Sequence, residues 1–166
     1  MSELAGRSIT LRPVHAGDEE FLYGVYASTR QEELAQTGWG EAQREAFLRQ
    51  QFDAQSRYYR EHYQDTSFDV ILADCRPIGR LYVARWPEEI RIVDIALLPE
   101  YRGAGVGTAM LGELISESEA SAKPLSIHVE RFNPALRLYE RLGFREVEDK
   151  GVYLLMQRAP ETRRLG

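Results

Sequence analysis

The feature that most constrains how this chain can fold is a glycine-rich segment near its middle, residues 95–111. The segment begins with an apolar run that is typical of a buried strand, and Pro99 ends that run. Three glycines within five residues, Gly103, Gly105 and Gly107, then open a helical pattern. Glycines at this place expose consecutive backbone N–H groups at the positive end of a helix, where they bind anionic oxygens such as those of a pyrophosphate.

Two known phosphate-binding motifs do not fit this segment. A Walker A loop is excluded because no Gly-Lys-Ser/Thr sequence follows the glycines. A dinucleotide-binding fingerprint that starts at Gly103 fits poorly, because it needs glycine or alanine where the chain has Thr108. A glycine-rich turn that only packs tightly is the remaining alternative, and the strand–turn–helix context favours phosphate binding over it.

Length and composition predict one globular domain, residues 1–166. The net charge of −5 disfavours binding to the phosphates of nucleic acid and favours a cationic acceptor. The single cysteine, Cys75, excludes an internal disulfide and a cysteine metal cluster. The first residues lack the apolar core of a signal peptide, and no apolar run could span a bilayer. We therefore expect a cytoplasmic protein with no metal, no nucleic acid partner and no membrane partner.

Hydrophobic periodicity and turn residues predict the order β-α-α-β-β-β-α-β-α-β-β. This order indicates an α/β (α+β) domain with a central mixed, mostly antiparallel sheet of about seven strands flanked by about four helices. The expected strands cover residues 8–13, 68–73, 78–86, 89–98 and 125–130, with a closing pair around 149–151. The expected helices cover residues 18–34, 41–62, 105–122 and 134–142.

Two blocks of sequence resemble the GNAT superfamily of acyl-CoA-dependent N-acyltransferases. Residues 102–107, Arg-Gly-Ala-Gly-Val-Gly, are similar to the R/Q-x-x-G-x-G/A motif of that family. Residues 133–144, Asn-Pro-Ala-Leu-Arg-Leu-Tyr-Glu-Arg-Leu-Gly-Phe, are similar to its later block. The blocks stand in the family's order, with a strand-bearing spacer between them, and the element order matches over residues 8–157.

The resemblance implies a single GNAT-like domain that uses acetyl-CoA as acyl donor and needs no metal. The strand before the turn would splay from its neighbour at a bulge and leave backbone groups for the pantetheine arm, whose amides can pair with an open strand edge. The residues implied to bind this cosubstrate are Ile95, Ala96, Leu97, Arg102, Gly103, Ala104, Gly105, Val106, Gly107, Thr108 and Asn133. Asn133 could also cap the following helix.

Direct attack of an amine on a thioester requires loss of a proton from the amine and a donor for the departing thiolate. The resemblance implies that Tyr139 is this donor, and a phenol with a pKa of about 10 is protonated at neutral pH. A packed aromatic on an amphipathic helix is the alternative for Tyr139. Cys75, at an expected hairpin turn, is a poor candidate for a covalent nucleophile.

The base candidates are His128, Glu130 and Asp94, on the two strands expected to flank the splayed gap. His128 and Glu130 share one strand face by the period of two. His128 lies where some family members carry a glutamate base, and an imidazole titrates near neutrality. For each residue, an ordinary solvated or hydrogen-bonded strand side chain is the alternative.

The expected function is transfer of acetyl from acetyl-CoA to the primary amine of a small-molecule or peptide/protein acceptor, in a ternary complex. The alternatives are a non-enzymatic acyl-CoA sensor on the same fold, a transferase of a longer acyl group, and a hydroxyl acceptor. The resemblance implies that residues 26–63 shape the acceptor side. For the oligomeric state, both a monomer and a homodimer are compatible with the sequence. Candidate acceptor residues in this range are Arg30, Glu32, Glu33, Trp39, Tyr58 and Tyr59.

Overall fold

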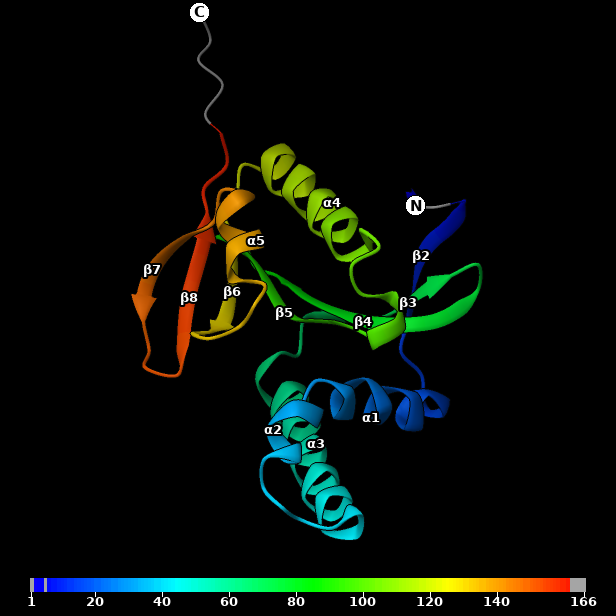
Figure 1. Ribbon diagram of the computed structural model, residues 1–166. Coiled ribbons are helices and arrows are strands. Elements are labelled where there is room, and N and C mark those ends of the chain that lie inside the picture. Colours follow the sequence, from blue (N-terminus) through cyan, green and yellow to red (C-terminus); the bar gives the residue numbers. More distant parts are fainter. Residues whose placement is uncertain (1, 5, 162–166) are drawn as a thin grey trace, which may run out of the picture. The chain divides into compact units, whose positions relative to one another are not determined.

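The computed structural model describes residues 2–4 and 6–161 (Figure 1). Within them, eight strands form one sheet of order β1-β2-β3-β4-β5-β6-β8-β7. Their bounds are Ser2–Leu4 (β1), Arg7–Pro13 (β2), Thr66–Ala73 (β3), Arg76–Arg85 (β4), Ile90–Leu97 (β5), Leu125–Glu130 (β6), Arg145–Asp149 (β7) and Tyr153–Arg158 (β8). The β5–β6 pair is parallel, whereas β1–β2, β2–β3, β6–β8 and β7–β8 are antiparallel. The predicted mixed sheet is therefore confirmed, and its one unexpected strand is the three-residue β1.

The helices flank this sheet, as the sequence predicts. Their bounds are Glu19–Ser28 (α1), Gln31–Ala35 (α2), Glu41–His62 (α3), Val106–Ser121 (α4) and Leu136–Arg141 (α5), with short 3-10 helices at Ala16–Asp18 (η1) and Pro99–Tyr101 (η2). None of the helices in the described part of the chain is long and apolar enough to cross a membrane.

The first predicted helix, residues 18–34, is divided into α1 and α2. The Ser28 hydroxyl donates to the Val25 carbonyl at 2.7 Å, and the Thr29 hydroxyl donates to the Tyr26 carbonyl at 2.6 Å. Such local bonds compete with the backbone bonds that would continue a helix. The hydrophobic pattern runs on into α2, so periodicity alone does not reveal this break.

The β3–β4 connection is a two-residue turn at Asp74 and Cys75, whose φ angles are +47° and +68°. Two residues of positive φ match the twist of the flanking strands. The Asp74 carboxylate accepts a hydrogen bond from the Ser8 N–H at 2.9 Å, so β2 also holds the turn. This turn lies where the sequence predicts a hairpin.

The contacts divide the chain into two compact units. The first comprises Met1–Tyr82 and Asp94–Gly107, and the second comprises Val83–Val93 and Thr108–Gly166. Strands β4 and β5 each contribute to both units. The prediction of one domain over residues 1–166 stays a prediction, and the site residues are described below unit by unit.

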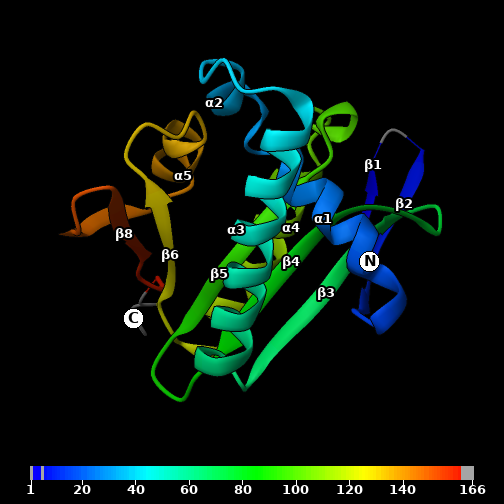
Figure 2. The ribbon, with the colours of Figure 1, turned by 90° about the horizontal axis from the view of Figure 1, so that it is seen from below.

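In the first unit, α1, α2 and α3 pack on one another around a shared apolar cluster (Figure 2). The cluster consists of Leu22, Tyr26, Leu34, Leu48 and Phe52. The α3 helix also contacts β4, because the Tyr59 and Tyr82 rings meet edge to face with centroids 5.9 Å apart. Its last turn carries Arg60 and His62, which suit the negative end of a helix dipole.

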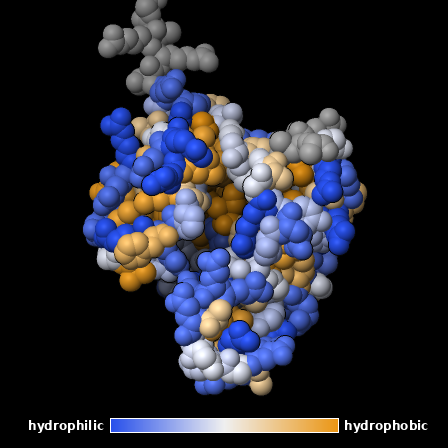
Figure 3. Space-filling model, viewed as in Figure 1, coloured by the Kyte–Doolittle hydropathy of each residue, from blue (hydrophilic) through white to orange (hydrophobic). Residues whose placement is uncertain are grey.

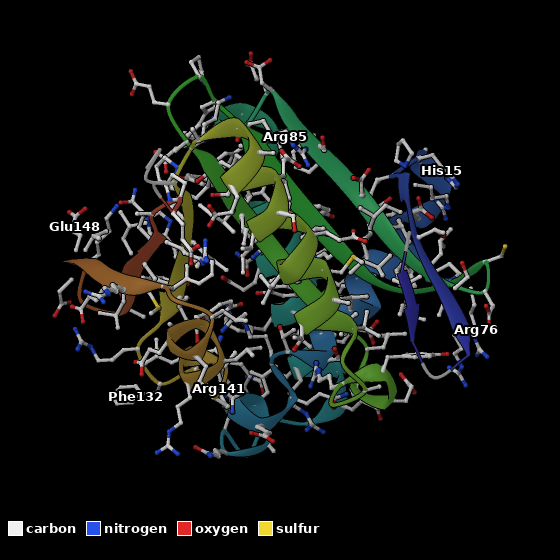
Figure 4. All side chains as sticks on the ribbon, turned by 90° about the horizontal axis from the view of Figure 1, so that it is seen from above. His15, Arg76, Arg85, Phe132, Arg141 and Glu148 are labelled. Atoms are coloured by element: carbon white, nitrogen blue, oxygen red, sulfur yellow. The ribbon has the colours of Figure 1, made fainter. Side chains whose placement is uncertain are left out.

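In the second unit, α4, β6 and β8 all contribute buried side chains to the core. The fully buried side chains include Met110, Leu111, Leu125 and Met156. Arg85, at the end of β4, forms a bidentate ion pair with Glu117 of α4, with N–O distances of 2.6 and 2.9 Å (Figure 4).

The α5 helix begins two residues later than the predicted residue 134, because Pro134 and Ala135 form a turn before it. The Asn133 side-chain oxygen accepts a hydrogen bond from the Ala135 N–H at 2.8 Å, which stabilises this turn. Gly143 follows the helix with a φ of +97°, the left-handed conformation expected of a glycine that ends a helix.

Candidate functional site

The glycine-rich turn lies in the first unit and joins β5 to α4. Gly103 and Gly105 have φ angles of +75° and +87°, in the region that glycine adopts without strain. Gly107 lies inside α4, and a Cβ added to it would meet no atom within 4 Å. Its backbone therefore tolerates a side chain. The first turn of α4 carries no acidic residue that would compete with an anion at its positive end.

Arg102 holds this turn in place. Its Nε donates to the Leu97 carbonyl at 3.0 Å, and its Nη2 donates to the Ser28 hydroxyl at 3.2 Å. Its backbone N–H donates to the Pro99 carbonyl at 3.2 Å. Arg102 thus connects the turn to the end of β5 and to the last residue of α1.

The exposure of β5 changes along its length. Ile90, Arg91 and Ile92 are buried and pair with β6, opposite Leu125, Ser126 and Ile127. The following residues 93–97 are all half-buried. Ile95, Ala96 and Leu97, the residues expected to bind pantetheine, lie in this half-buried part and belong to the first unit.

Asp94 lies in a buried polar network of the first unit. Its Oδ2 accepts hydrogen bonds from Arg80 Nη2 at 2.8 Å and from the Tyr59 hydroxyl at 2.9 Å. Arg80 is 3% exposed and also donates to Gln55 at 3.1 Å. Burial, and then the adjacent Asp94 carboxylate, raise the pKa of Tyr59. These contacts make the Asp94 carboxylate the counter-ion of a buried guanidinium, which argues against Asp94 as the base.

His128 lies in the second unit between two cations. Its Nε2 is 3.1 Å from Lys150 Nζ, and its Nδ1 is 3.4 Å from Arg91 Nη1. Burial lowers the pKa of His128, and the charges of Arg91 and Lys150 lower it further. The imidazole is therefore neutral at pH 7. Arg91 itself is fixed by the Ser126 hydroxyl at 2.7 Å.

The other candidates of the second unit occupy the predicted elements. Glu130 is the last residue of β6, lies opposite Tyr153 of β8, and shares a strand face with His128. Tyr139, on α5, is 6% exposed, and its ring meets Phe144 edge to face at 5.6 Å. Tyr139 is therefore a packed aromatic, and its role as acid stays a prediction.

Residues of the three amino-terminal helices and their connections line a half-open pocket of about 200 Å³ in the first unit. It is lined by Tyr26, Arg30, Glu33, Leu34, Phe47 and Gln51. The Arg30 guanidinium lies 3.3 Å from the Glu33 carboxylate and 5.7 Å from the centre of the Tyr26 ring. This cavity falls in the range expected to shape the acceptor side.

Known proteins similar to this chain identify its family. Residues 29–144, well over half of the chain, match the sequence pattern described as the acetyltransferase (GNAT) family. The chain belongs to the GNAT acetyltransferase family. Within it, 67 residues are 39% identical to the ribosomal protein bS18-alanine N-acetyltransferase of Haemophilus influenzae, over 40% of this chain and 46% of that relative. The match thus spans about half the length of that curated relative.

Solved structures share the GNAT fold of this chain. The PaiA N-acetyltransferase from Thermoplasma acidophilum, in complex with coenzyme A, has a TM-score of 0.69 and 20% identity, over 92% of this chain and 99% of that one. A GNAT family acetyltransferase from Elizabethkingia anophelis with acetyl-CoA bound has a TM-score of 0.58 and 16% identity, over 91% and 97%. At these identities the likeness concerns the fold alone.

Sequence reasoning missed two residues of this GNAT chain that contact the candidate site. Arg80 is a charged residue among the apolar residues of β4, and that is the signal that could have revealed a buried ion pair. Gly79 precedes it, and a Cβ on Gly79 would lie 2.3 Å from the Ala96 carbonyl oxygen. A glycine inside a strand often marks a close approach of another backbone.

Proposed function

We propose that this protein is an N-acetyltransferase that moves the acetyl group of acetyl-CoA to a primary amine. The observation that carries the proposal is the turn after β5, where Gly103 and Gly105 adopt positive φ immediately before the first turn of α4. This geometry suits a pyrophosphate. The fold shared with GNAT structures that contain coenzyme A or acetyl-CoA supports the same donor.

The acceptor that we propose to test first is the α-amine of a peptide or protein. The support is the relative named for acetylating an alanine of ribosomal protein bS18. A small-molecule amine is the alternative within the same reaction. Both acceptors are mostly protonated at neutral pH, so each must lose a proton before it attacks the thioester.

We assign the chemistry of direct transfer to side chains of the second unit. His128, neutral at pH 7, or Glu130 on the same face of β6 takes the amine proton, directly or through water. The Tyr139 hydroxyl donates a proton to the departing thiolate. Asp94 is not part of this scheme, because Arg80 and Tyr59 engage its carboxylate.

The decisive experiment follows release of free coenzyme A thiol from acetyl-CoA over a panel of acceptors. The panel contains short peptides with free amino termini, the same peptides with acetylated termini, polyamines, and a hydroxyl compound. Thiol release only with the free amines, together with a mass increase of one acetyl group, supports the proposal. Tight CoA binding without release on any acceptor would favour the sensor, and faster release from longer acyl-CoA donors would favour the longer-chain transferase.

A further inference from the structure

Gly79 on β4 is crowded by the backbone of β5. A Cβ built on Gly79 would lie 2.3 Å from the Ala96 carbonyl oxygen, 2.8 Å from Leu97 Cδ2 and 3.1 Å from Leu97 Cα. Real Cβ atoms essentially never approach another heavy atom closer than 3.0 Å. Two of these three neighbours are backbone atoms, which cannot turn aside as the end of a side chain can. Residue 79 must therefore be glycine, because no Cβ fits between these atoms.

This contact reveals the local shape of β5. In a regular sheet, side chains project from the faces, whereas the carbonyl groups of a neighbouring strand lie near the plane of the sheet. A carbonyl oxygen at the place of the Gly79 side chain therefore means that the Ala96–Leu97 peptide is displaced out of the plane, over the face of β4. The Leu98 N–H then bonds to the Ile78 carbonyl at 2.9 Å, so β5 is attached to β4 again directly after the displacement.

The displaced peptide has a defined direction. No cis peptide bond occurs in the described part of the chain, so the Leu97 N–H points opposite to the Ala96 C=O. Because that carbonyl faces Gly79, the N–H is directed away from β4. A hydrogen-bond donor directed in this way can be offered to an amide carbonyl of an extended ligand.

The next residue of β4 fixes β5 on the opposite face, since successive side chains of a strand alternate. Arg80 holds Asp94 at 2.8 Å, and Tyr59 of α3 completes this contact. Gly79 and Arg80 thus position two alternate residues of β5. Gly79 leaves room for the Ala96 carbonyl, and the Arg80 guanidinium holds the Asp94 carboxylate. The displacement of the β5 peptide is therefore determined by these two residues of β4.

We propose that Gly79 is a positioning residue for the acyl donor, because it holds the Ala96–Leu97 peptide where the pantetheine arm pairs with it. This inference rests on the proposed function. A side chain at residue 79 would push this peptide out of place, whereas none of the three nearest atoms that its Cβ would meet belongs to the glycine-rich turn.

The test compares two ligands on the same variant by calorimetric titration. Coenzyme A contains the pantetheine arm, whereas 3′-phosphoadenosine 5′-diphosphate contains the pyrophosphate without it. For Gly79→Ala we expect the Kd of coenzyme A to rise about tenfold or more and that of the fragment to stay within about twofold. In turnover, the KM for acetyl-CoA should rise while the KM for the acceptor is unchanged. The matched control is Gly24→Ala in α1, where a Cβ meets no atom within 4 Å.

Ala96→Gly keeps the inference testable if Gly79→Ala does not fold, since it adds backbone freedom at the displaced peptide without a clash. Ala96→Gly should raise the Kd of coenzyme A about threefold and leave the Kd of 3′-phosphoadenosine 5′-diphosphate unchanged. Unchanged coenzyme A affinity in a folded Gly79→Ala protein would overturn the inference, as would an equal loss for both ligands, which indicates general loosening. If the wild-type protein binds neither ligand, the proposed function itself fails.

Discussion

At the scale of single residues, the candidate site owes its chemistry to what surrounds each titratable group. Arg80 and Tyr59 engage the Asp94 carboxylate, whereas burial, Arg91 and Lys150 lower the pKa of the His128 imidazole. All three base candidates lie on the strands predicted for them, and their neighbours distinguish them. These neighbours come from distant parts of the chain, so the sequence alone could not have ranked the candidates.

Replacing Tyr139 with phenylalanine should lower turnover about 100-fold, as expected for loss of a positioned acid. The ring contact with Phe144 survives in the variant, so only the hydroxyl group is tested. Steady-state kinetics with acetyl-CoA and a good amine acceptor measure the effect, and the Kd of coenzyme A should stay within a few-fold. Turnover close to that of the wild type would make Tyr139 a packing residue.

The pH dependence of the rate tests His128. As a base it must be neutral, so the rate at limiting acceptor should rise with pH through its pKa. Because burial and two cations lower that pKa, this rise should lie below about pH 6.5. His128→Gln should flatten the rise, whereas Glu130→Gln should retain it.

An acceptor of lower pKa serves as the control for this profile, because the acceptor's own titration then moves and that of His128 does not. If Glu130→Gln alone removes the rise, the base is Glu130. If both variants keep the wild-type profile, the protein acts by positioning an amine that is already neutral.

At the scale of elements, the sequence predicts most accurately the turns and helix ends that local residue preferences determine. The glycine-rich turn, the β3–β4 turn and the start of α4 follow from glycine and turn chemistry, and the structure has them within a residue or two. The division of the first helix follows from two hydroxyl groups that bond back to the backbone, which hydrophobic periodicity does not register. The displacement in β5 depends on which residue of β4 lies opposite Ala96, and that register is a tertiary property.

Gly105→Val should weaken coenzyme A binding by about 1–3 kcal/mol, because valine resists the positive φ and its side chain intrudes on the phosphate site. Gly38→Val is the matched control, since Gly38 has a φ of +73° in a loop and no atom within 4 Å of its Cβ position. Both variants carry similar backbone strain, and only the first should lose affinity in calorimetric titration. Equal affinities for coenzyme A in the two variants would contradict the assignment of the pyrophosphate to this turn.

At the scale of the whole molecule, the predicted fold class is confirmed by the observed sheet and by the solved GNAT structures that share it. The sequence does not anticipate that the contacts divide the chain into two units, because β4 and β5 run through both and no linker marks the boundary. The first unit contains the candidate donor-binding residues as far as Gly107, and the second contains Tyr139, His128 and Glu130. The chemical groups proposed for catalysis thus come from a different unit than most of those proposed for binding.

Global stability should depend strongly on the Arg80–Asp94 pair. Asp94→Asn leaves the buried guanidinium without its anion and should lower the free energy of unfolding by about 3–5 kcal/mol. Urea unfolding at pH 7 measures the loss. Glu20→Gln, which breaks the exposed Arg49–Glu20 pair at 2.9 Å, is the control and should change stability little. Equal, small losses in both variants would show that the buried pair does not hold the fold.

The tight turn between β3 and β4 has a practical consequence for spectroscopy. It presents Cys75 to solvent, and no other cysteine exists in the sequence. The Asp74 carboxylate, which accepts a hydrogen bond from Ser8, holds this turn, and the Cys75 thiol is not part of that contact. A maleimide dye or a nitroxide attached there marks one known position in the wild-type sequence. Rotational correlation times and label-to-ligand distances can therefore be recorded without first removing competing thiols.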